Sequence, residues 1–332
     1  MEQIMSQNLF GFLAEQAKEH QEVPRLKINL YRNYEVSAVA KAAMQLLGEG
    51  LPCRVECVMI SDSYLMTHLG RTSTTLETKS DQDEFFQIMK GLTKEVSEAV
   101  LAGFPANIRP FVLADMPDGS TANAETAIEN AAQMLAVGAD AVKLEIFSND
   151  RFDIVHALTE AGIPVISHLG YTPQNGENRS VGNSTDEAFE LFAKARLARD
   201  AGSKGLVLER VNELVNQCLC RPSLHGVPSY SIFSGQADWG GQSLNVWDSI
   251  MKPDFKSQFF PDTATKTRAD FPECYTEEAL FASMYELMRQ SIETSYPRSP
   301  VSKLLQSDLR QIICANPWRE AAPASKARLR AA

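Results

Sequence analysis

Acidic side chains follow four short apolar runs of this sequence, at the points where predicted strands end. These four residues are Asp62, Asp115, Glu145 and Glu209. If the strand ends meet at one site, the four carboxylates repel one another and raise each other's pKa, so a bound cation is expected among them. Oxygen donors without a cysteine favour Mg²⁺ over zinc as that cation.

Other polar side chains stand at the same predicted strand ends. Ser63 is the neighbour of Asp62, Lys143 lies two positions before Glu145, and His168 ends a further run. A 2-oxo acid can fill two open positions on Mg²⁺ through its carboxylate and ketone oxygens. Lys143 and His168 would then lie beside the ketone, whose polarisation acidifies the α-carbon so that a carboxylate can remove a proton. The pattern therefore predicts enolate chemistry.

Each of these residues also has a structural explanation when it is taken alone. An aspartate at a strand end often caps a helix or forms a turn, as Asp62 could. Lys143 and Glu145 share one face of a strand and could form only a salt bridge. His168 could be a structural histidine, and Glu209 a solvated strand end. Their common position at strand ends is what favours a chemical role.

Strands and helices alternate along the chain, and this alternation determines where the polar residues lie. Apolar runs predict strands, and apolar residues at helical spacing, mostly followed by glycine, predict helices. The predicted strands are 27–31, 54–60, 110–114, 141–145, 163–167, 205–209 and 227–233, with an eighth within 250–260. The predicted helices are 36–47, 83–102, 124–137, 150–161, 185–201 (with Ser184 or Thr185 as its N-cap), 212–220, 241–250 and a C-terminal 276–294.

This order of elements predicts a parallel sheet with crossover helices, either a closed (β/α)₈ barrel or an open doubly wound sheet. The glycine-rich fingerprint that an open nucleotide-binding sheet carries after an early strand is absent from the sequence. Polar residues at five or more strand ends favour the barrel, because all its strand ends meet at one mouth. We predict a single (β/α)₈ TIM barrel over residues 25–300. An N-terminal helical extension (1–24) precedes it, and a C-terminal extension and tail (301–332) follow.

Charge and hydropathy narrow the class of protein. The chain has 32 basic and 42 acidic residues, and its net charge of −10 disfavours nucleic-acid and anionic-membrane partners. No apolar run approaches the roughly 20 residues that span a bilayer, and the first residues lack the pattern of a signal peptide. We therefore expect a cytoplasmic protein that has no nucleic-acid or membrane partner.

Six motifs at and near the predicted strand ends follow one another in the order of a known enzyme family. They are Ile-Ser-Asp-Ser at 60–63, Leu-Ala-Asp-Met-Pro at 113–117, Ala-Ile-Glu-Asn-Ala-Ala at 127–132, Val-Lys-Leu-Glu at 142–145, Ile-Pro-Val-Ile-Ser-His-Leu-Gly-Tyr-Thr-Pro-Gln at 163–174 and Leu-Val-Leu-Glu at 206–209. Together they resemble the ketopantoate hydroxymethyltransferases (3-methyl-2-oxobutanoate hydroxymethyltransferases), barrels of the phosphoenolpyruvate mutase/isocitrate lyase superfamily. The resemblance covers residues 27–300, and the segment 168–174 is its most specific part.

The resemblance implies roles for the residues at the first three of these strand ends. Asp62 and Asp115 would bind Mg²⁺, and Glu145 would support the ion. Ser63 and Lys143 would bind the keto acid, so the expected substrate-binding residues are Asp62, Ser63, Asp115 and Lys143.

The resemblance also implies a reaction. Glu209 would be the general base, with Lys143 and His168 as the other catalytic residues. The family adds a hydroxymethyl group, taken from 5,10-methylenetetrahydrofolate, to the α-carbon of a branched 2-oxo acid. Its members are typically cytosolic homo-oligomers, often decamers, so the expected partners are a 2-oxo acid, a folate and further copies of the chain.

The chain departs from the family pattern around the expected pocket. Ser61 stands where the family usually has glycine, and the segments 31–34, 175–182 and 234–238 differ from the usual family motifs. The identity of the 2-oxo acid therefore stays open. Two other functions also stay open, namely a folate-independent 2-oxo acid aldolase or C–C lyase of the same superfamily and a barrel that serves only as a binding or scaffold subunit.

Overall fold

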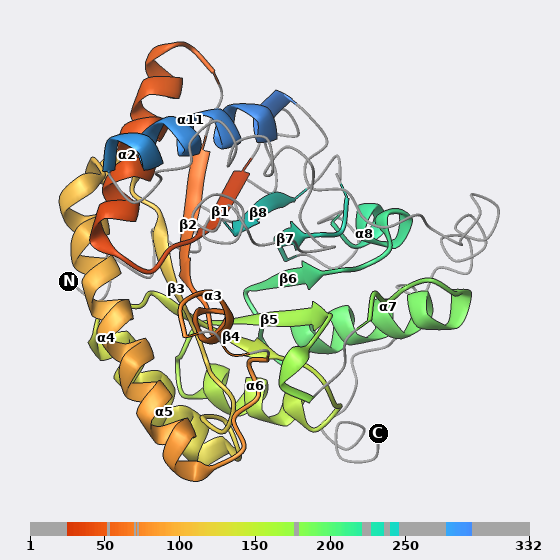
Figure 1. Ribbon diagram of the computed structural model, residues 1–332. Coiled ribbons are helices and arrows are strands. Elements are labelled where there is room, and N and C mark those ends of the chain that lie inside the picture. The colour runs from red at the N-terminus through yellow and green to blue at the C-terminus, as the bar shows by residue number, and fades with distance from the viewer. Residues whose placement is uncertain are drawn as a thin grey trace.

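Eight parallel strands form a closed barrel in the order β1 to β8, and helices surround it (Figure 1). The computed structural model describes residues 25–51, 54–69, 71, 73–175, 179–220, 227–235, 240–245 and 277–293. The predicted (β/α)₈ barrel is confirmed. The expected extensions at 1–24 and 301–332 lie outside the described residues.

The strands are short, and the helices between them differ widely in length. The strands are β1 (Arg25–Asn29), β2 (Arg54–Ile60), β3 (Phe111–Asp115), β4 (Ala141–Glu145), β5 (Val165–Gly170), β6 (Gly205–Glu209), β7 (Ser229–Ile232) and β8 (Gly241–Asn245). The helices are α2 (Asn33–Gly48), α3 (Tyr64–Thr67), α4 (Lys79–Gly103), α5 (Ala124–Ala136), α6 (Arg151–Glu160), α7 (Thr185–Asp200), α8 (Glu213–Leu219) and α11 (Glu277–Glu293), with 3₁₀ turns at Ala106–Ile108 and Pro173–Asn175.

The prediction for residues 241–250 is wrong, because Gly241–Asn245 forms strand β8 and not a helix. This strand pairs with β1 and with β7 and so closes the barrel. Its short segment carries a single aliphatic side chain, that of Leu244, so apolar spacing could not separate a strand from a helix. A Cβ atom at Gly241 would lie 2.5 Å from the ring of Tyr230, so the glycine allows β7 and β8 to approach each other. The predicted strand within 250–260 lies outside the described residues.

Local sequence signals position several helices. The side chains of Thr78, Asn123 and Ser184 cap the N-termini of α4, α5 and α7 by accepting a hydrogen bond from a backbone N–H three residues on. Of the two predicted N-caps of α7, Ser184 and Thr185, Ser184 is the one that the structure shows. Gly138 ends the turn after α5 with φ = +108°, where an added Cβ would lie 2.2 Å from the Ser97 hydroxyl oxygen. These caps fix where the helices begin, and the glycine turn fixes where β4 enters the barrel.

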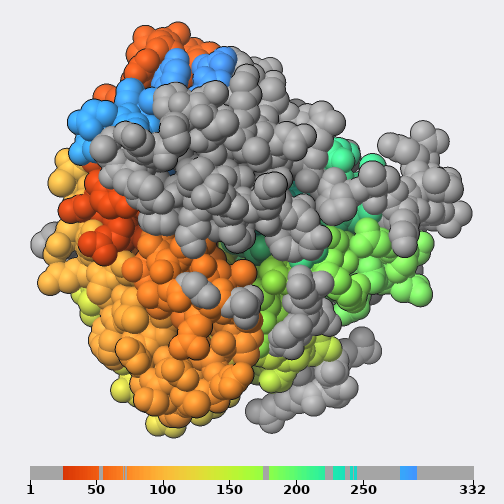
Figure 2. All heavy atoms as spheres, viewed as in Figure 1, coloured from red at the N-terminus to blue at the C-terminus, as the bar shows by residue number. Residues whose placement is uncertain are grey.

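The buried apolar side chains form two layers. One layer lies between the strands and the helices. Helix α11 packs onto α2 next to this layer, and Figure 2 shows the two helices side by side at the surface. The other fills the inside of the barrel with Cys57, Met59, Phe111, Leu113, Ala141, Ile166, Val207, Tyr230 and Ile232. None of the helices in the described ranges has both the length and the apolar character of a membrane span. At the C-terminal strand ends this inner layer gives way to charged side chains.

Candidate active site

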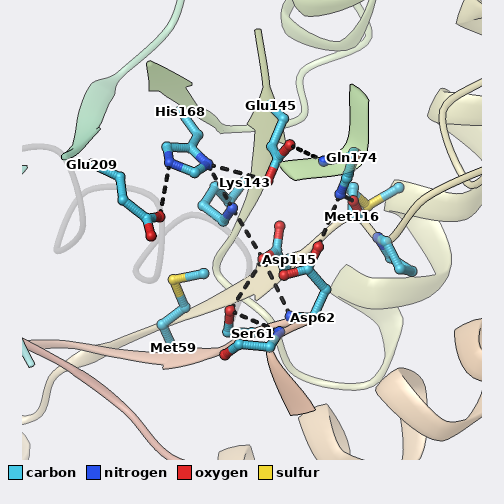
Figure 3. A network of polar contacts seen from close by, with 12 residues as sticks. Met59, Ser61, Asp62, Asp115, Met116, Lys143, Glu145, His168, Gln174 and Glu209 are labelled. Carbon is cyan, nitrogen blue, oxygen red and sulfur yellow. Dashed lines mark hydrogen bonds and ion pairs between the residues drawn. The ribbon is translucent and has the colours of Figure 1, made fainter. Parts of the chain in front are cut away.

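The barrel brings the predicted site residues together. They stand at or just beyond the C-terminal ends of strands β2 to β6, and Figure 3 shows most of them around one centre. Parallel pairing places Asp115 beside Lys143 and Glu145 beside His168 on neighbouring strands. The expectation that separate strand ends form one site is therefore met for these side chains.

Two buried aspartates lie side by side. The backbone N–H of Asp62 donates to Asp115 Oδ2 at 3.3 Å, and the Ser61 hydroxyl donates to the same oxygen at 3.4 Å. Burial, and next the charge of Asp115, raise the pKa of Asp62 from 3.8 to about 7. The other oxygen of Asp115, Oδ1, is buried and has no hydrogen-bond partner among the described residues. Asp115 Oδ1 can therefore still bind a cation.

Lys143 supplies a positive charge next to this pair. Its Nζ lies 3.0 Å from Asp115 Oδ2 and 3.1 Å from His168 Nδ1. Burial opposes the charge of the ammonium group, but the carboxylates of Asp115, Glu145 and Asp62 outweigh burial and raise its pKa. Lys143 is therefore a cation at neutral pH.

His168 connects Lys143 to two glutamates. Its Nδ1 lies 3.5 Å from Glu145 Oε1, and its Nε2 lies 3.2 Å from Glu209 Oε2. Burial and the charge of Lys143 lower the pKa of His168. The contacts with Glu145 and Glu209 raise it by more, so the pKa lies above its ordinary value. The side chain of Glu209 is 21% exposed and that of His168 only 2%. Glu209 is therefore the group in this series of contacts that a substrate can reach.

Gln174 is a site residue that the sequence prediction missed. Its backbone N–H donates to Glu145 Oε2 at 3.0 Å, and its side-chain amide donates to Asp62 Oδ2 at 3.0 Å and to the Met116 carbonyl at 3.1 Å. The residue lies in the motif 168–174, which was its only signal, and an uncharged side chain past the end of a strand does not stand out. Gln174 therefore connects Asp62 to the loop after β5.

The sequence of the chain is similar to those of known enzymes. Residues 38–273 match the family model described as ketopantoate hydroxymethyltransferase. The chain belongs to the ketopantoate hydroxymethyltransferase family. It is 33% identical over 216 residues to the 3-methyl-2-oxobutanoate hydroxymethyltransferase of Ignicoccus hospitalis, which covers 62% of this chain and 75% of the relative. It is 36% identical over 234 residues to that of Pyrobaculum islandicum, which covers 68% of this chain and 82% of the relative.

A solved structure agrees with the fold. The chain is similar to a Burkholderia cenocepacia J2315 protein that is classed provisionally as a lyase/mutase, with a TM-score of 0.52 and 12% identity. The match covers 89% of this chain and all of that one. At this identity the likeness shows the fold only. The family match is what makes the chain a member of a transferase family of enzymes.

The residues at the site fit the Mg²⁺ ion that the ketopantoate hydroxymethyltransferase resemblance implies. Within the described ranges, no three histidine, cysteine or acidic side chains are grouped to hold an ion. Mg²⁺ is commonly held by one or two carboxylates, with water and substrate oxygens completing its shell. Asp62 and Asp115 match this pattern, because the first has a raised pKa and the second an unpartnered buried oxygen. Glu145 contacts His168 and Gln174 instead.

Ser61 and Ser63 have different partners in this family member. Ser61, at the position where the family usually has glycine, points its hydroxyl at Asp115. Ser63 Oγ lies 2.7 Å from the Tyr31 hydroxyl, so the ring of Tyr31 orients it. Ser61, which replaces the usual glycine, therefore contacts Asp115, a residue expected to bind the metal ion. The Ser63 hydroxyl, which is expected to bind the substrate, is held by Tyr31, a residue that follows β1.

Proposed function

We propose that this enzyme transfers a hydroxymethyl group from 5,10-methylenetetrahydrofolate to the α-carbon of a 2-oxo acid with the help of Mg²⁺. The observation that carries the proposal is the buried series of contacts from Asp115 through Lys143 and His168 to Glu209. It joins the acidic pair to a reachable carboxylate. The relatives' name, 3-methyl-2-oxobutanoate hydroxymethyltransferase, supports this class of reaction.

In this proposal Asp62 and Asp115 hold the ion, which when bound supplies Lewis-acid polarisation of the keto acid. The Lys143 ammonium would donate to a substrate oxygen as negative charge develops on it. A fixed donor in a buried site stabilises such a charge because it needs little reorganisation. Ser63, oriented by Tyr31, would donate to the substrate carboxylate.

Glu209 is the general base of the proposal. It would remove the proton from the α-carbon, and the carbanion would attack the methylene carbon of the folate. A C–C bond forms, both C–N bonds of the methylene carbon break, and water supplies the hydroxyl oxygen. One folate nitrogen takes up the proton that Glu209 removed, and the other takes up a proton from the water. His168, 3.2 Å from Glu209, holds the carboxylate in place. The partners in this proposal are the two small molecules and further copies of the chain.

Proton exchange tests the first step. The protein is incubated in D₂O with 3-methyl-2-oxobutanoate and Mg²⁺, and exchange at the α-carbon is followed by NMR with and without the folate. We expect exchange that a chelator abolishes and that Glu209→Gln lowers by about 100-fold or more. Glu129→Gln, on the exposed face of α5, is the matched control and should exchange at the wild-type rate.

The outcomes separate the functions that the sequence left open. No exchange with any 2-oxo acid would refute the proposal. Exchange without a hydroxymethyl product, when the folate is supplied, would favour the folate-independent aldolase or lyase.

A further inference from the structure

A second lysine lies inside the barrel next to the candidate site. Lys27 on β1 is 1% exposed. Its Nζ donates to Asn29 Oδ1 at 2.7 Å and lies 3.1 Å from Met59 Sδ. Neither partner has a negative charge, and the ion pairs among the residues that the structure describes do not include Lys27. A buried ammonium group without a carboxylate partner is rare in proteins.

The strand register places this ammonium group just below the acidic pair. Lys27 is paired with Cys57, and Asn29 with Met59. The backbone of Lys27 therefore lies two residues below Met59 along the barrel, and its side chain points into the barrel toward Met59. Ser61 lies two positions beyond Met59. Two residues span about 6.6 Å of strand, which is about the reach of an extended lysine side chain. Figure 3 draws Met59 among the residues of the site, and the charges of Lys143, Asp115 and Glu209 act on Lys27. The Lys27 ammonium group, 3.1 Å from Met59 Sδ, therefore lies near the floor of the site.

The charges of the site act on Lys27. Burial is the main reason why the pKa of Lys27 falls from 10.5 to about 8, and the charge of Lys143 acts in the same direction. The neighbouring Cys57 raises the pKa, but not enough to offset burial. Asp115 and Glu209 raise the pKa, but neither compensates for burial. Lys27 is therefore a cation at neutral pH whose hydration has been removed and whose charge no direct partner balances.

We propose that Lys27 binds a second anionic group of the substrate, so that the substrate is a 2-oxo acid with a carboxylate on its side chain. The inference rests on the proposed function, in which the other end of the keto acid is held by Ser63, Lys143 and the ion. A purely aliphatic side chain would lie against the ammonium group and leave it unpaired. A carboxylate would pair with it and complete its hydrogen bonds.

Two features of the surroundings agree with this role. The Asn29 side chain accepts one hydrogen bond and so fixes the direction of the ammonium group. The Met59 thioether is a weak acceptor on a flexible side chain, which can move aside for a stronger acceptor. The arrangement leaves donor capacity on Lys27 for an anion.

A matched pair of acids tests the inference. 2-Oxoglutarate and 5-methyl-2-oxohexanoate differ in that an isopropyl group replaces the distal carboxylate. Their binding is measured by calorimetry with Mg²⁺ present, for the wild type, for Lys27→Met and for Lys94→Met, an exposed control on α4. We expect the wild type and the control to bind 2-oxoglutarate about 10- to 100-fold more tightly than the analogue. Lys27→Met should lose this preference.

Several results would overturn the inference. A wild type that binds both acids equally, or prefers the isopropyl analogue, would refute it without any variant. If Lys27→Met binds both acids more weakly by the same factor, the lysine has a structural role. The same conclusion follows if the variant is more stable and keeps the wild-type preference for 2-oxoglutarate.

The failure of the inference and the failure of the proposed function look different. If 3-methyl-2-oxobutanoate exchanges its α-hydrogen but 2-oxoglutarate does not bind, only the inference fails. If 2-oxoglutarate binds through Lys27 but no 2-oxo acid exchanges, only the proposed function fails.

Discussion

The acidic pair makes a prediction about stability that needs no substrate. Asp62 has a pKa of about 7 in the folded protein and 3.8 as its ordinary value, because it is buried beside Asp115. The folded state therefore binds a proton that the unfolded state has lost between these two values. Stability is present in full at low pH and falls as the pH rises through about 7. Asp62→Asn removes this titration and keeps an oxygen that can accept from Gln174.

The size of the effect follows from the two pKa values. Each unit of difference corresponds to 1.36 kcal/mol, so the full shift amounts to about 4 kcal/mol. Between pH 5 and pH 8 the Asp62 contribution should make the metal-free protein about 2 to 3 kcal/mol less stable. The other titratable groups are common to both proteins, so the comparison with Asp62→Asn isolates the contribution of Asp62.

The assay is urea unfolding of both proteins at pH 5, 6, 7 and 8 in the presence of a chelator. We expect the free energy of unfolding of Asp62→Asn, minus that of the wild type, to grow by about 2 to 3 kcal/mol over this range. Saturating Mg²⁺ should reverse the trend in the wild type alone, because the ion stabilises the ionised folded state. A difference that does not change with pH, or a variant less stable than the wild type at pH 8 without metal, would refute the account of the pair.

Further variants test the metal ligands and the backbone of the site. Asp115→Asn should weaken Mg²⁺ binding more than Ser63→Ala does, because it removes a charged ligand, and equal affinities in calorimetry would contradict this assignment. Gly170→Ala should lower the free energy of unfolding by about 3 kcal/mol or more, since φ is +104° and its Cβ would lie 2.2 Å from the Glu209 carbonyl oxygen. Gly91→Ala, in open space on α4, should instead raise stability by up to about 1 kcal/mol, and a Gly170→Ala protein with wild-type stability would show that this strain is absent.

The regular part of the fold could be predicted from the sequence because its signals are local. Strands β4 and β6 have the predicted bounds, since a glycine turn precedes each apolar run and a glutamate ends it. The joint position of Asp62, Asp115 and Lys143 at strand ends predicted one site, because a parallel barrel brings such ends to one mouth.

The rest depends on contacts between distant segments. Strand β8 is defined by pairing with β1 and β7 more than by its own residues, so its five-residue segment resembled part of a helix. The sequence predicts only that Lys27 begins a strand, and the closed barrel is needed to bring its ammonium group to Met59. Gln174 acquired its role through a loop that folds back over Asp62.

Transfer of the one-carbon unit is the central claim, and product analysis tests it most directly. The protein is incubated with Mg²⁺, a 2-oxo acid and 5,10-methylenetetrahydrofolate whose methylene carbon carries a heavy isotope, and the acids are analysed by mass spectrometry and NMR. We predict an acid that has gained one labelled hydroxymethyl group at its α-carbon, formed by the wild type and not by Glu209→Gln. If neither aliphatic nor dicarboxylic 2-oxo acids acquire the label, the account is contradicted.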